Sequence, residues 1–234
     1  MTRPIICVDG IDGSGKSRLA ARIVQEAVAH RIGVALLRVD DFRRRVDWDE
    51  PGIVESDAYY DRYHDLERLD RCVQAYLRGD DAVEVPYFDP SREQITETRQ
   101  LALRGVEVLV IEGVFARRLP SAADATLVYV ATSYPEARRR ILARDTARGR
   151  TAVEVSRRID RRYVPTQLRY HREHQPRERA HVVIDHETIG AAHAPHIALD
   201  GRPAVVVACL RFLGDGPSGA AISFAASAAA KESA

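Results

Sequence analysis

Short apolar runs alternate along the chain with stretches of helical periodicity. Continuous apolar runs of four to eight residues are typical of strands buried on both faces, whereas apolar residues three or four positions apart predict amphipathic helices. We therefore expect five strands, at residues 5–9, 34–39, 106–111, 125–131 and 180–185, and helices over residues 16–30, 57–78, 135–144 and 151–163. This alternation predicts an α/β fold, a three-layer sandwich in which helices cover both faces of a parallel sheet of about five strands.

Polar residues follow three of the predicted strands directly. They are the glycine-rich segment 10–17, the pair Asp40 and Asp41, and Glu112 with Gly113. Because parallel sheets bind ligands outside the carboxyl ends of their strands, we expect these groups to line one crevice. We assign residues 1–213 to a single domain and residues 214–234, rich in Gly, Ser and Ala, to a flexible tail.

The segment 10–17 reads Gly-Ile-Asp-Gly-Ser-Gly-Lys-Ser and fits the phosphate-binding pattern G-x-x-x-x-G-K-[ST]. Glycines allow a tight turn whose N–H groups point inward, and the following helix adds the positive end of its dipole. The pattern predicts that Lys16 reaches the β- and γ-phosphates of a nucleoside triphosphate and that the Ser17 hydroxyl binds Mg²⁺. The residues expected to bind the phosphates are Gly10, Asp12, Gly13, Ser14, Gly15, Lys16 and Ser17.

Composition narrows the possible partners. The chain has 35 basic and 34 acidic residues and a net charge of +1, which does not indicate binding to nucleic acid or to an anionic membrane. Cys7, Cys72 and Cys209 lie far apart, so neither a disulfide framework nor a zinc site is expected, and the cytoplasm is the expected compartment. We recognise no signal peptide and no long apolar span. A homo-oligomer is compatible with the sequence.

Two acids at strand ends are candidates for catalysis. Glu112 follows an apolar run and is expected to hold Mg²⁺ directly or through water. Of Asp40 and Asp41, adjacent side chains on an extended segment point in opposite directions, so one is expected to face the crevice, and we favour Asp40. It would orient the attacking hydroxyl or take its proton. The arginine-rich stretch 138–179 reflects either codon usage or a cationic lid over the phosphates.

These segments, in order along most of residues 5–185, resemble the uridine/cytidine kinase family of P-loop small-molecule kinases. Residues 39–42 are similar to its strand-end Asp-Ser/Asp-Phe, residues 108–115 to its apolar run ending in Glu-Gly-Ile/Val-Phe, and residues 140–150 to its Arg-Asp…Arg-Gly-Arg lid segment. The resemblance implies a catalytic role for Lys16, Asp40 and Arg144, and a lid at about residues 144–162. It also implies that Arg144 and Arg148 close over ATP, that Arg150 faces the acceptor, and that Ser17, Asp40 and Glu112 position Mg²⁺.

The acceptor site departs from the family pattern. The family's Pro-x-Tyr-Asp-Phe with a following His and Arg appears here as residues 86–92, with the Asp and Phe inverted and the His missing. By resemblance, Tyr87 or Phe88 stacks on a base and Arg92 hydrogen-bonds to it; the alternative is a packed hairpin edge. The acid that binds the ribose hydroxyls is Asp57 or Asp61, and we favour Asp57.

We expect an ATP- and Mg²⁺-dependent kinase for a hydroxyl of a small molecule, with the 5′-hydroxyl of uridine or cytidine favoured. One alternative is a kinase for another acceptor, such as nicotinamide riboside, pantothenate or a sugar phosphate. A second alternative, of a different class, is an ATP-binding sensor that transfers nothing.

Overall fold

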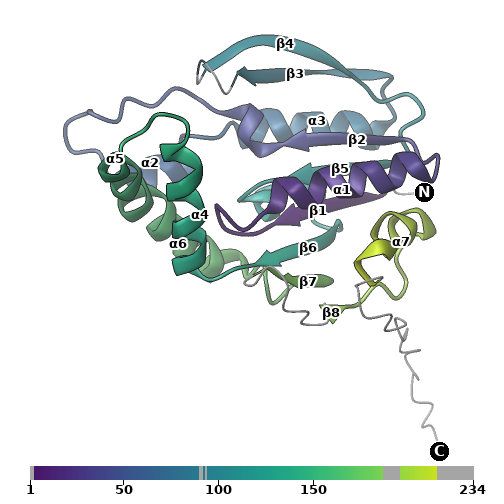
Figure 1. Ribbon diagram of the computed structural model, residues 1–234. Coiled ribbons are helices and arrows are strands. Elements are labelled where there is room, and N and C mark those ends of the chain that lie inside the picture. Colours follow the sequence, from purple (N-terminus) through teal and green to yellow (C-terminus); the bar gives the residue numbers. More distant parts are fainter. Residues whose placement is uncertain (1–2, 90–91, 93, 187–195, 215–234) are drawn as a thin grey trace, which may run out of the picture.

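The core of the protein is a mostly parallel sheet. The computed structural model describes residues 3–89, 92, 94–186 and 196–214. Within this part of the chain the sheet has six strands in the order β2-β5-β1-β6-β7-β8 (Figure 1). The strands are β1 (Ile5–Asp9), β2 (Val34–Arg38), β5 (Val108–Glu112), β6 (Thr126–Ala131), β7 (Val182–Asp185) and β8 (His196–Ile197). The first five are parallel and β8 is antiparallel to β7, so the predicted five-stranded parallel sheet is confirmed.

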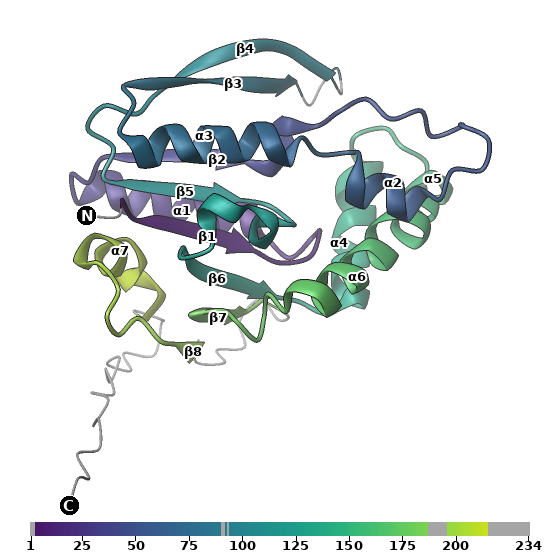
Figure 2. The same cartoon turned by 180° about the vertical axis from the view of Figure 1, so that it is seen from behind.

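Side chains that alternate along the strands build two separate cores. On β1, Ile5 and Cys7 pack on the face covered by α3 (Leu66–Arg78), together with alternate residues of β2 and β5. Ile6 and Val8 pack on the opposite face with α1 (Lys16–Ala29) and α7 (Ala204–Leu210). Figures 1 and 2 show these helices on opposite sides of the sheet. The predicted three-layer arrangement is therefore confirmed.

A hairpin lies outside the α3 layer (Figure 2). Its strands are β3 (Ala82–Asp89) and β4 (Gln94–Ala102), which pair antiparallel and form a sheet of their own. The sequence does not predict the hairpin as two strands, because eight of the nine residues of β4 are exposed and the strand carries no apolar stripe.

The predicted helix over residues 57–78 is wrong, because two helices occupy this range. They are α2 (Glu55–Asp61) and α3. Between them, the Arg44 N–H donates to the Tyr63 carbonyl and the Asp65 N–H to the Phe42 carbonyl, each at 2.7 Å. The Asp65 side chain then caps α3 by accepting from the Arg68 N–H. Pairing with the segment after β2 thus interrupts the helix.

The remaining helices gather beyond the carboxyl ends of the strands (Figure 1). These are α4 (Tyr134–Thr146), α5 (Ala152–Arg158), a π-helical turn (Ile159–Tyr163) and α6 (Val164–His174), with α2 beside them. The predicted lid, about residues 144–162, covers the end of α4, α5 and most of the π turn, and its function as a lid stays a prediction. Short 3₁₀ turns lie at Val39–Phe42, Ala116–Arg118, Pro120–Ala122 and Arg211–Gly214. The predicted tail falls outside the described residues from residue 215 onward.

The three cysteines are buried and unpaired: Cys7 in the sheet, Cys72 on α3 and Cys209 on α7. The described part of the chain holds no cluster of His, Cys, Asp and Glu suited to a metal ion. It also holds no helix with the length and apolar character needed to span a bilayer.

Candidate active site

A cavity of about 390 Å³ lies where β1, β2 and β5 end. Residues from the three predicted polar groups line it, as do side chains from α2 and α4 and the residue after β7. Its lining includes Asp12, Gly13, Gly15, Lys16, Ser17, Arg18, Asp40, Tyr59, His64, Glu112, Gly113, Arg140, Arg144, Arg148 and His186. The structure therefore brings the phosphate loop, Asp40 and Glu112 to one crevice.

The phosphate loop joins β1 to α1 in a tight turn. Gly10 has φ +149°, and a Cβ there would lie 2.6 Å from the Val130 carbonyl oxygen, so a side chain is not accommodated. Lys16 begins α1, is 7% exposed, and donates from Nζ to the Ile11 carbonyl at 3.0 Å. Its ammonium group is thus held over the loop, where it can neutralise phosphate charge.

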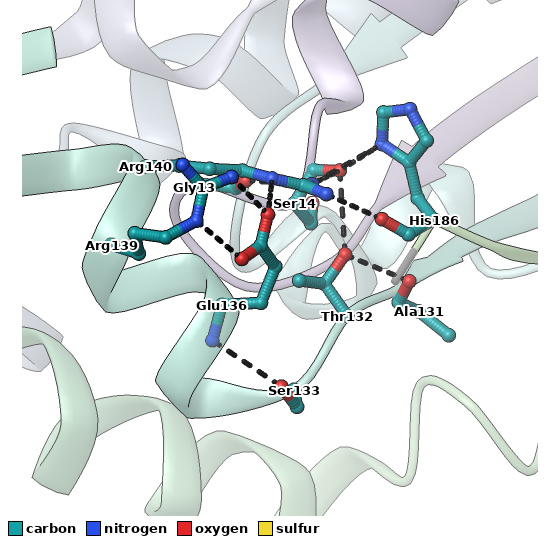
Figure 3. Close-up of polar contacts among 9 residues, drawn as sticks. All are labelled: Gly13, Ser14, Ala131, Thr132, Ser133, Glu136, Arg139, Arg140 and His186. Atoms are coloured by element: carbon teal, nitrogen blue, oxygen red, sulfur yellow. Dashed lines mark hydrogen bonds and ion pairs between the residues drawn. The ribbon is translucent and has the colours of Figure 1, made fainter. Parts of the chain in front are cut away.

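Arg140 and His186 contact backbone carbonyl groups on the outer side of this loop (Figure 3). Arg140 Nη1 lies 3.4 Å from the carbonyl oxygens of both Gly13 and Ser14, and Nη2 donates to the His186 carbonyl at 2.6 Å. His186 Nδ1 lies 2.6 Å from the Ser14 oxygen, which can only accept, so Nδ1 carries the hydrogen. Glu136 accepts from Arg140 Nε at 2.7 Å. With their carbonyls bonded on the outside, the loop peptides can turn N–H groups toward a ligand.

Asp12 connects the loop to the helices beyond the strand ends. Its Oδ2 accepts from Gln167 Nε2 on α6 at 2.7 Å and lies 3.5 Å from the Tyr59 hydroxyl on α2. The carboxylate is therefore bound to protein donors, and its predicted phosphate-binding role stays a prediction.

Ser17 and Glu112 provide adjacent oxygen ligands. The Ser17 hydroxyl donates to Glu112 Oε1 at 3.1 Å, and both residues line the cavity. Burial raises the pKa of Glu112, with the nearby Lys16 charge opposing this shift. Mg²⁺ requires oxygen ligands and commonly takes one or two protein groups plus phosphate and water, so this pair fits the ion.

Asp40 lines the same cavity from the 3₁₀ turn (Val39–Phe42) that follows β2. Although burial opposes its ionisation, Arg43 and His64 hold the pKa of Asp40 well below its usual range. Arg43 Nη2 is 2.7 Å from its Oδ2, and His64 Nε2 is 3.6 Å from its Oδ1. The side chain is still 59% exposed because it faces the cavity. Gly113 follows Glu112 and Val39 precedes Asp40. A Cβ at Gly113 (φ +151°) would lie 2.5 Å from Val39 Cβ, so the two segments are in close contact. This contact places Glu112 and Asp40 in the same wall of the cavity.

Among the arginines of the predicted lid segment, Arg144 and Arg148 line the cavity. Arg144 Nε bonds to Asp145 Oδ1 at 2.7 Å, which fixes its position at the end of α4. Arg150 bonds to Asp145 Oδ2 at 3.1 Å and is not among the cavity-lining residues. Its predicted contact with the acceptor is therefore not visible in this arrangement.

The other predicted acceptor residues also lie away from the cavity. Asp57 is exposed on α2 and pairs with Arg169 at 3.6 Å, beside a second, shallow pocket. The Tyr87 ring lies 3.3 Å from the Arg99 guanidinium, and Arg92 is exposed beside Asp89. This placement favours the alternative of a packed hairpin edge for Tyr87, while the binding roles stay predictions.

The sequence did not identify Tyr59, His64, Arg140 and His186 as cavity residues. Tyr59 and His64 reach the cavity because α2 ends at Asp61 and the chain turns back against the segment after β2. His186 carried one usable signal, since it directly follows the strand predicted to close the sheet.

Comparison with known proteins identifies the family. A model described as "Phosphoribulokinase / Uridine kinase family" matches residues 5–187. The chain belongs to this family. The matched residues include the phosphate loop, the turn with Asp40, the strand end with Glu112 and the arginine-rich segment.

Solved structures share the fold of this family member at low sequence identity. A possible uridine kinase from Bacillus stearothermophilus is 22% identical, with a TM-score of 0.60 over 79% of this chain and 90% of that one. Phosphoribulokinase from Rhodobacter spheroides is 17% identical, with a TM-score of 0.56 over 79% and 70%. D-glycerate 3-kinase from Cryptococcus neoformans is 14% identical, with a TM-score of 0.54 over 81% and 89%. These three differ in the acceptor that their names state.

Proposed function

We propose that the protein is a cytoplasmic kinase that transfers the γ-phosphoryl group of ATP to a hydroxyl of a small molecule, with Mg²⁺. The observation that carries this proposal is the convergence of Lys16, Asp40 and Glu112 on one cavity. A phosphate-binding cation, a metal-holding acid and a second acid facing the same space are the parts that phosphoryl transfer requires.

Each side chain would have a separate task. Lys16 and the loop amides bind the phosphates, while Ser17 and Glu112 hold Mg²⁺, which neutralises charge on the β- and γ-phosphates. Asp40 orients the acceptor hydroxyl and accepts a hydrogen bond from it. Because Arg43 and His64 favour its ionised form, Asp40 is available as an acceptor at neutral pH. Arg144 and Arg148 reach the same cavity and would stabilise charge on the transferred group.

The favoured acceptor is the 5′-hydroxyl of a pyrimidine nucleoside, uridine or cytidine. Family membership and the aromatic side chain of Tyr59 at the cavity support it. The placement of Tyr87 and Arg92 away from the cavity supports the alternative acceptors: nicotinamide riboside, pantothenate or a sugar phosphate.

Replacement of Lys16 tests phosphoryl transfer. With radiolabelled ATP and these acceptors, we expect Lys16→Ala to lower kcat by at least ~100-fold, the usual loss when one preorganised charge-stabilising group is removed. The control is Lys231→Ala, because Lys16 and Lys231 are the only two lysines in the chain. Equal turnover by Lys16→Ala and the wild type would refute the mechanism.

The alternative of an ATP sensor is tested at Asp40. We expect Asp40→Asn to keep ATP binding in calorimetry and to lose transfer to every acceptor, since Asp40 contacts the acceptor and not the loop. A sensor predicts instead that the wild type itself binds ATP and phosphorylates nothing.

A further inference from the structure

The outer edge of the β3–β4 hairpin is open. Figures 1 and 2 show β3 between α3 and β4, with β4 outermost. Val83, Val85 and Leu101 pack against the core that includes α3, which fixes the position of the hairpin. Within the part of the chain that the structure describes, β4 pairs with β3 alone, and eight of its nine residues are exposed. An open strand edge presents unpaired N–H and C=O groups to which another strand can add.

The ladder between β3 and β4 shows which residues offer these groups. The Leu103 N–H donates to the Asp81 carbonyl at 2.8 Å, and the register is regular from there to Thr98, which lies opposite Pro86. Hydrogen-bonded and non-hydrogen-bonded pairs alternate along an antiparallel ladder, so Thr98, five positions from Leu103, is in a non-hydrogen-bonded pair. Pro86 suits such a pair because it has no N–H to donate. The N–H and C=O groups of Thr98 therefore point to the open edge.

The side chains of β4 are self-complementary about Thr98. Glu97 precedes this residue and Arg99 follows it. Ile95 and Leu101 lie three positions away on either side. Two β4 strands that pair antiparallel with Thr98 at the centre place Glu97 of each copy opposite Arg99 of the other. The same register places Ile95, which is 40% exposed, opposite Leu101. Ion pairs and apolar pairs in these cross-strand positions stabilise a sheet.

The two charges also exclude the neighbouring symmetric registers. Glu97 and Arg99 lie on one face of β4, 2.6 Å apart, and about half of each side chain is exposed. A pairing centred on Glu97 would set two carboxylates opposite each other, and a pairing centred on Arg99 would set two guanidinium groups opposite each other. Like charges in directly opposite positions are destabilising. The charge pattern thus selects one register and one partner, a second copy of the same strand.

We propose that β4 pairs with β4 of a second copy of this chain, in a two-fold symmetric dimer whose axis passes through Thr98. The two hairpins then form one antiparallel sheet in the order β3-β4-β4-β3. A two-fold dimer joins the same surface of both partners, which is what a self-complementary strand provides. None of the β4 residues lines the cavity, so this proposal does not rest on the proposed function.

The size of the edge sets the expected strength of the dimer. Nine residues in β4 are fewer than the roughly 20–30 residues that each partner contributes to a standard interface. We therefore expect a dimer that dissociates on dilution, with a Kd on the order of micromolar.

Charge reversal tests the pairing. In sedimentation velocity from about 1 to 200 µM, the wild type should dimerise as its concentration rises. Glu97→Arg and Arg99→Glu each set like charges opposite each other, and each should raise the dimer Kd about 10-fold or more. An equimolar mixture of the two variants should form a heterodimer, because the arginines of one then face the carboxylates of the other.

The control for charge is Glu178→Arg, a change of the same size at an exposed position outside the hairpin, which should dimerise as the wild type does. A wild type that stays monomeric overturns the proposal. Single variants that dimerise as well as the wild type, or a mixture without heterodimer, also overturn it.

Two cysteine variants test the register without changing the charge. Thr98→Cys brings the two thiols together at the axis, whereas in Gln100→Cys four residues of strand, about 14 Å, separate the two Cα atoms. A disulfide needs Cα atoms within about 7 Å. Both positions are exposed on one face of β4, and the native cysteines are buried. Under mild oxidation Thr98→Cys should cross-link at least ~10-fold faster than Gln100→Cys. Equal rates of cross-linking overturn the proposal.

Discussion

Asp9 is an ionisable group enclosed by the fold next to the phosphate loop. It ends β1, is completely buried, and accepts hydrogen bonds from the Gly10 N–H at 2.6 Å and the Tyr170 hydroxyl at 2.5 Å. Desolvation outweighs these bonds and raises the pKa of Asp9 to about 6. Near neutral pH the native state therefore retains this carboxylate at a cost in stability.

The pH dependence of Asp9→Asn should reveal this cost. The raised pKa means that the native state holds the proton more tightly than the unfolded state, so stability falls as pH rises from about 4 to 6. Asparagine removes this dependence. Relative to the wild type, the variant should gain up to about 3 kcal/mol between pH 4 and 7 in urea unfolding, corresponding to a shift of roughly two pKa units. A difference that does not vary with pH contradicts the assignment.

Residues at the strand ends were predictable from sequence because their neighbours are local. The glycines and Lys16 belong to one short pattern, and Asp40 and Glu112 directly follow apolar runs. Tyr59 on α2 and His64 in the turn after it were not predictable, because contacts with a segment about twenty residues earlier bring them to the cavity. Arg140 could not be distinguished from the neighbouring arginines, since only the three-dimensional contact with the Gly13 and Ser14 carbonyls singles it out.

At the scale of elements, Glu55 joins α2 to the helices of the predicted lid. Its side chain is 6% exposed and lies 3.0 Å from Arg157 and 2.5 Å from Arg162. Arg162 also stacks on Trp48 at 3.7 Å. The arginines favour the ionised carboxylate and lower the pKa of Glu55 against the effect of burial. These ion pairs link α2 to α5 and to the π turn.

Glu55→Ala should separate these elements. The variant leaves Arg162, which is 11% exposed, without its carboxylate, and we expect a loss of about 2 kcal/mol in the free energy of unfolding, between the values for exposed and fully buried pairs. Faster proteolysis within residues 147–163 should accompany it. Glu154→Ala is the control, because its partner Arg158 lies on the same helix and the carboxylate is 43% exposed. Equal losses in both variants would show that the cluster has no linking role.

Strands with a continuous apolar pattern were predicted correctly. Elements whose ends depend on contacts with distant parts of the chain were not. Strands β1, β5 and β6 are buried at every position, so each of their residues contributes to the signal. The hairpin β3–β4 lacks such a signal because β4 packs one edge against β3 and exposes the rest. The break between α2 and α3 is also nonlocal, since it depends on the backbone bonds that Phe42 and Arg44 make.

At the scale of the whole molecule, the residues that line the cavity come from both ends of the segment that matches the family model, residues 5–187. Its walls include residues of the loop after β1, of α2, of α4 and the residue after β7. A ligand that binds there contacts all of these elements only in the native state, so it should stabilise the entire domain against unfolding.

A thermal shift with a non-hydrolysable ATP analogue tests this coupling. At 100 times its Kd the ligand adds about 2.7 kcal/mol. For a chain of this length, that corresponds to a rise of roughly 5–10 °C in the midpoint. Removing Mg²⁺ with EDTA should reduce the rise, and Lys16→Ala should abolish most of it. A rise of the same size in Lys16→Ala would place nucleotide binding elsewhere.

The three buried cysteines give the molecule one thiol in the sheet and one in each helical layer. Burial raises the pKa to about 12 for Cys7 and to about 11 for Cys72 and Cys209, so the native thiols hardly form the thiolate that alkylating reagents need. Pulses of iodoacetamide followed by peptide mass spectrometry should therefore time the opening of each layer separately. Labelling of Cys209 ahead of Cys7 and Cys72 would identify α7 as the first layer to detach from the sheet.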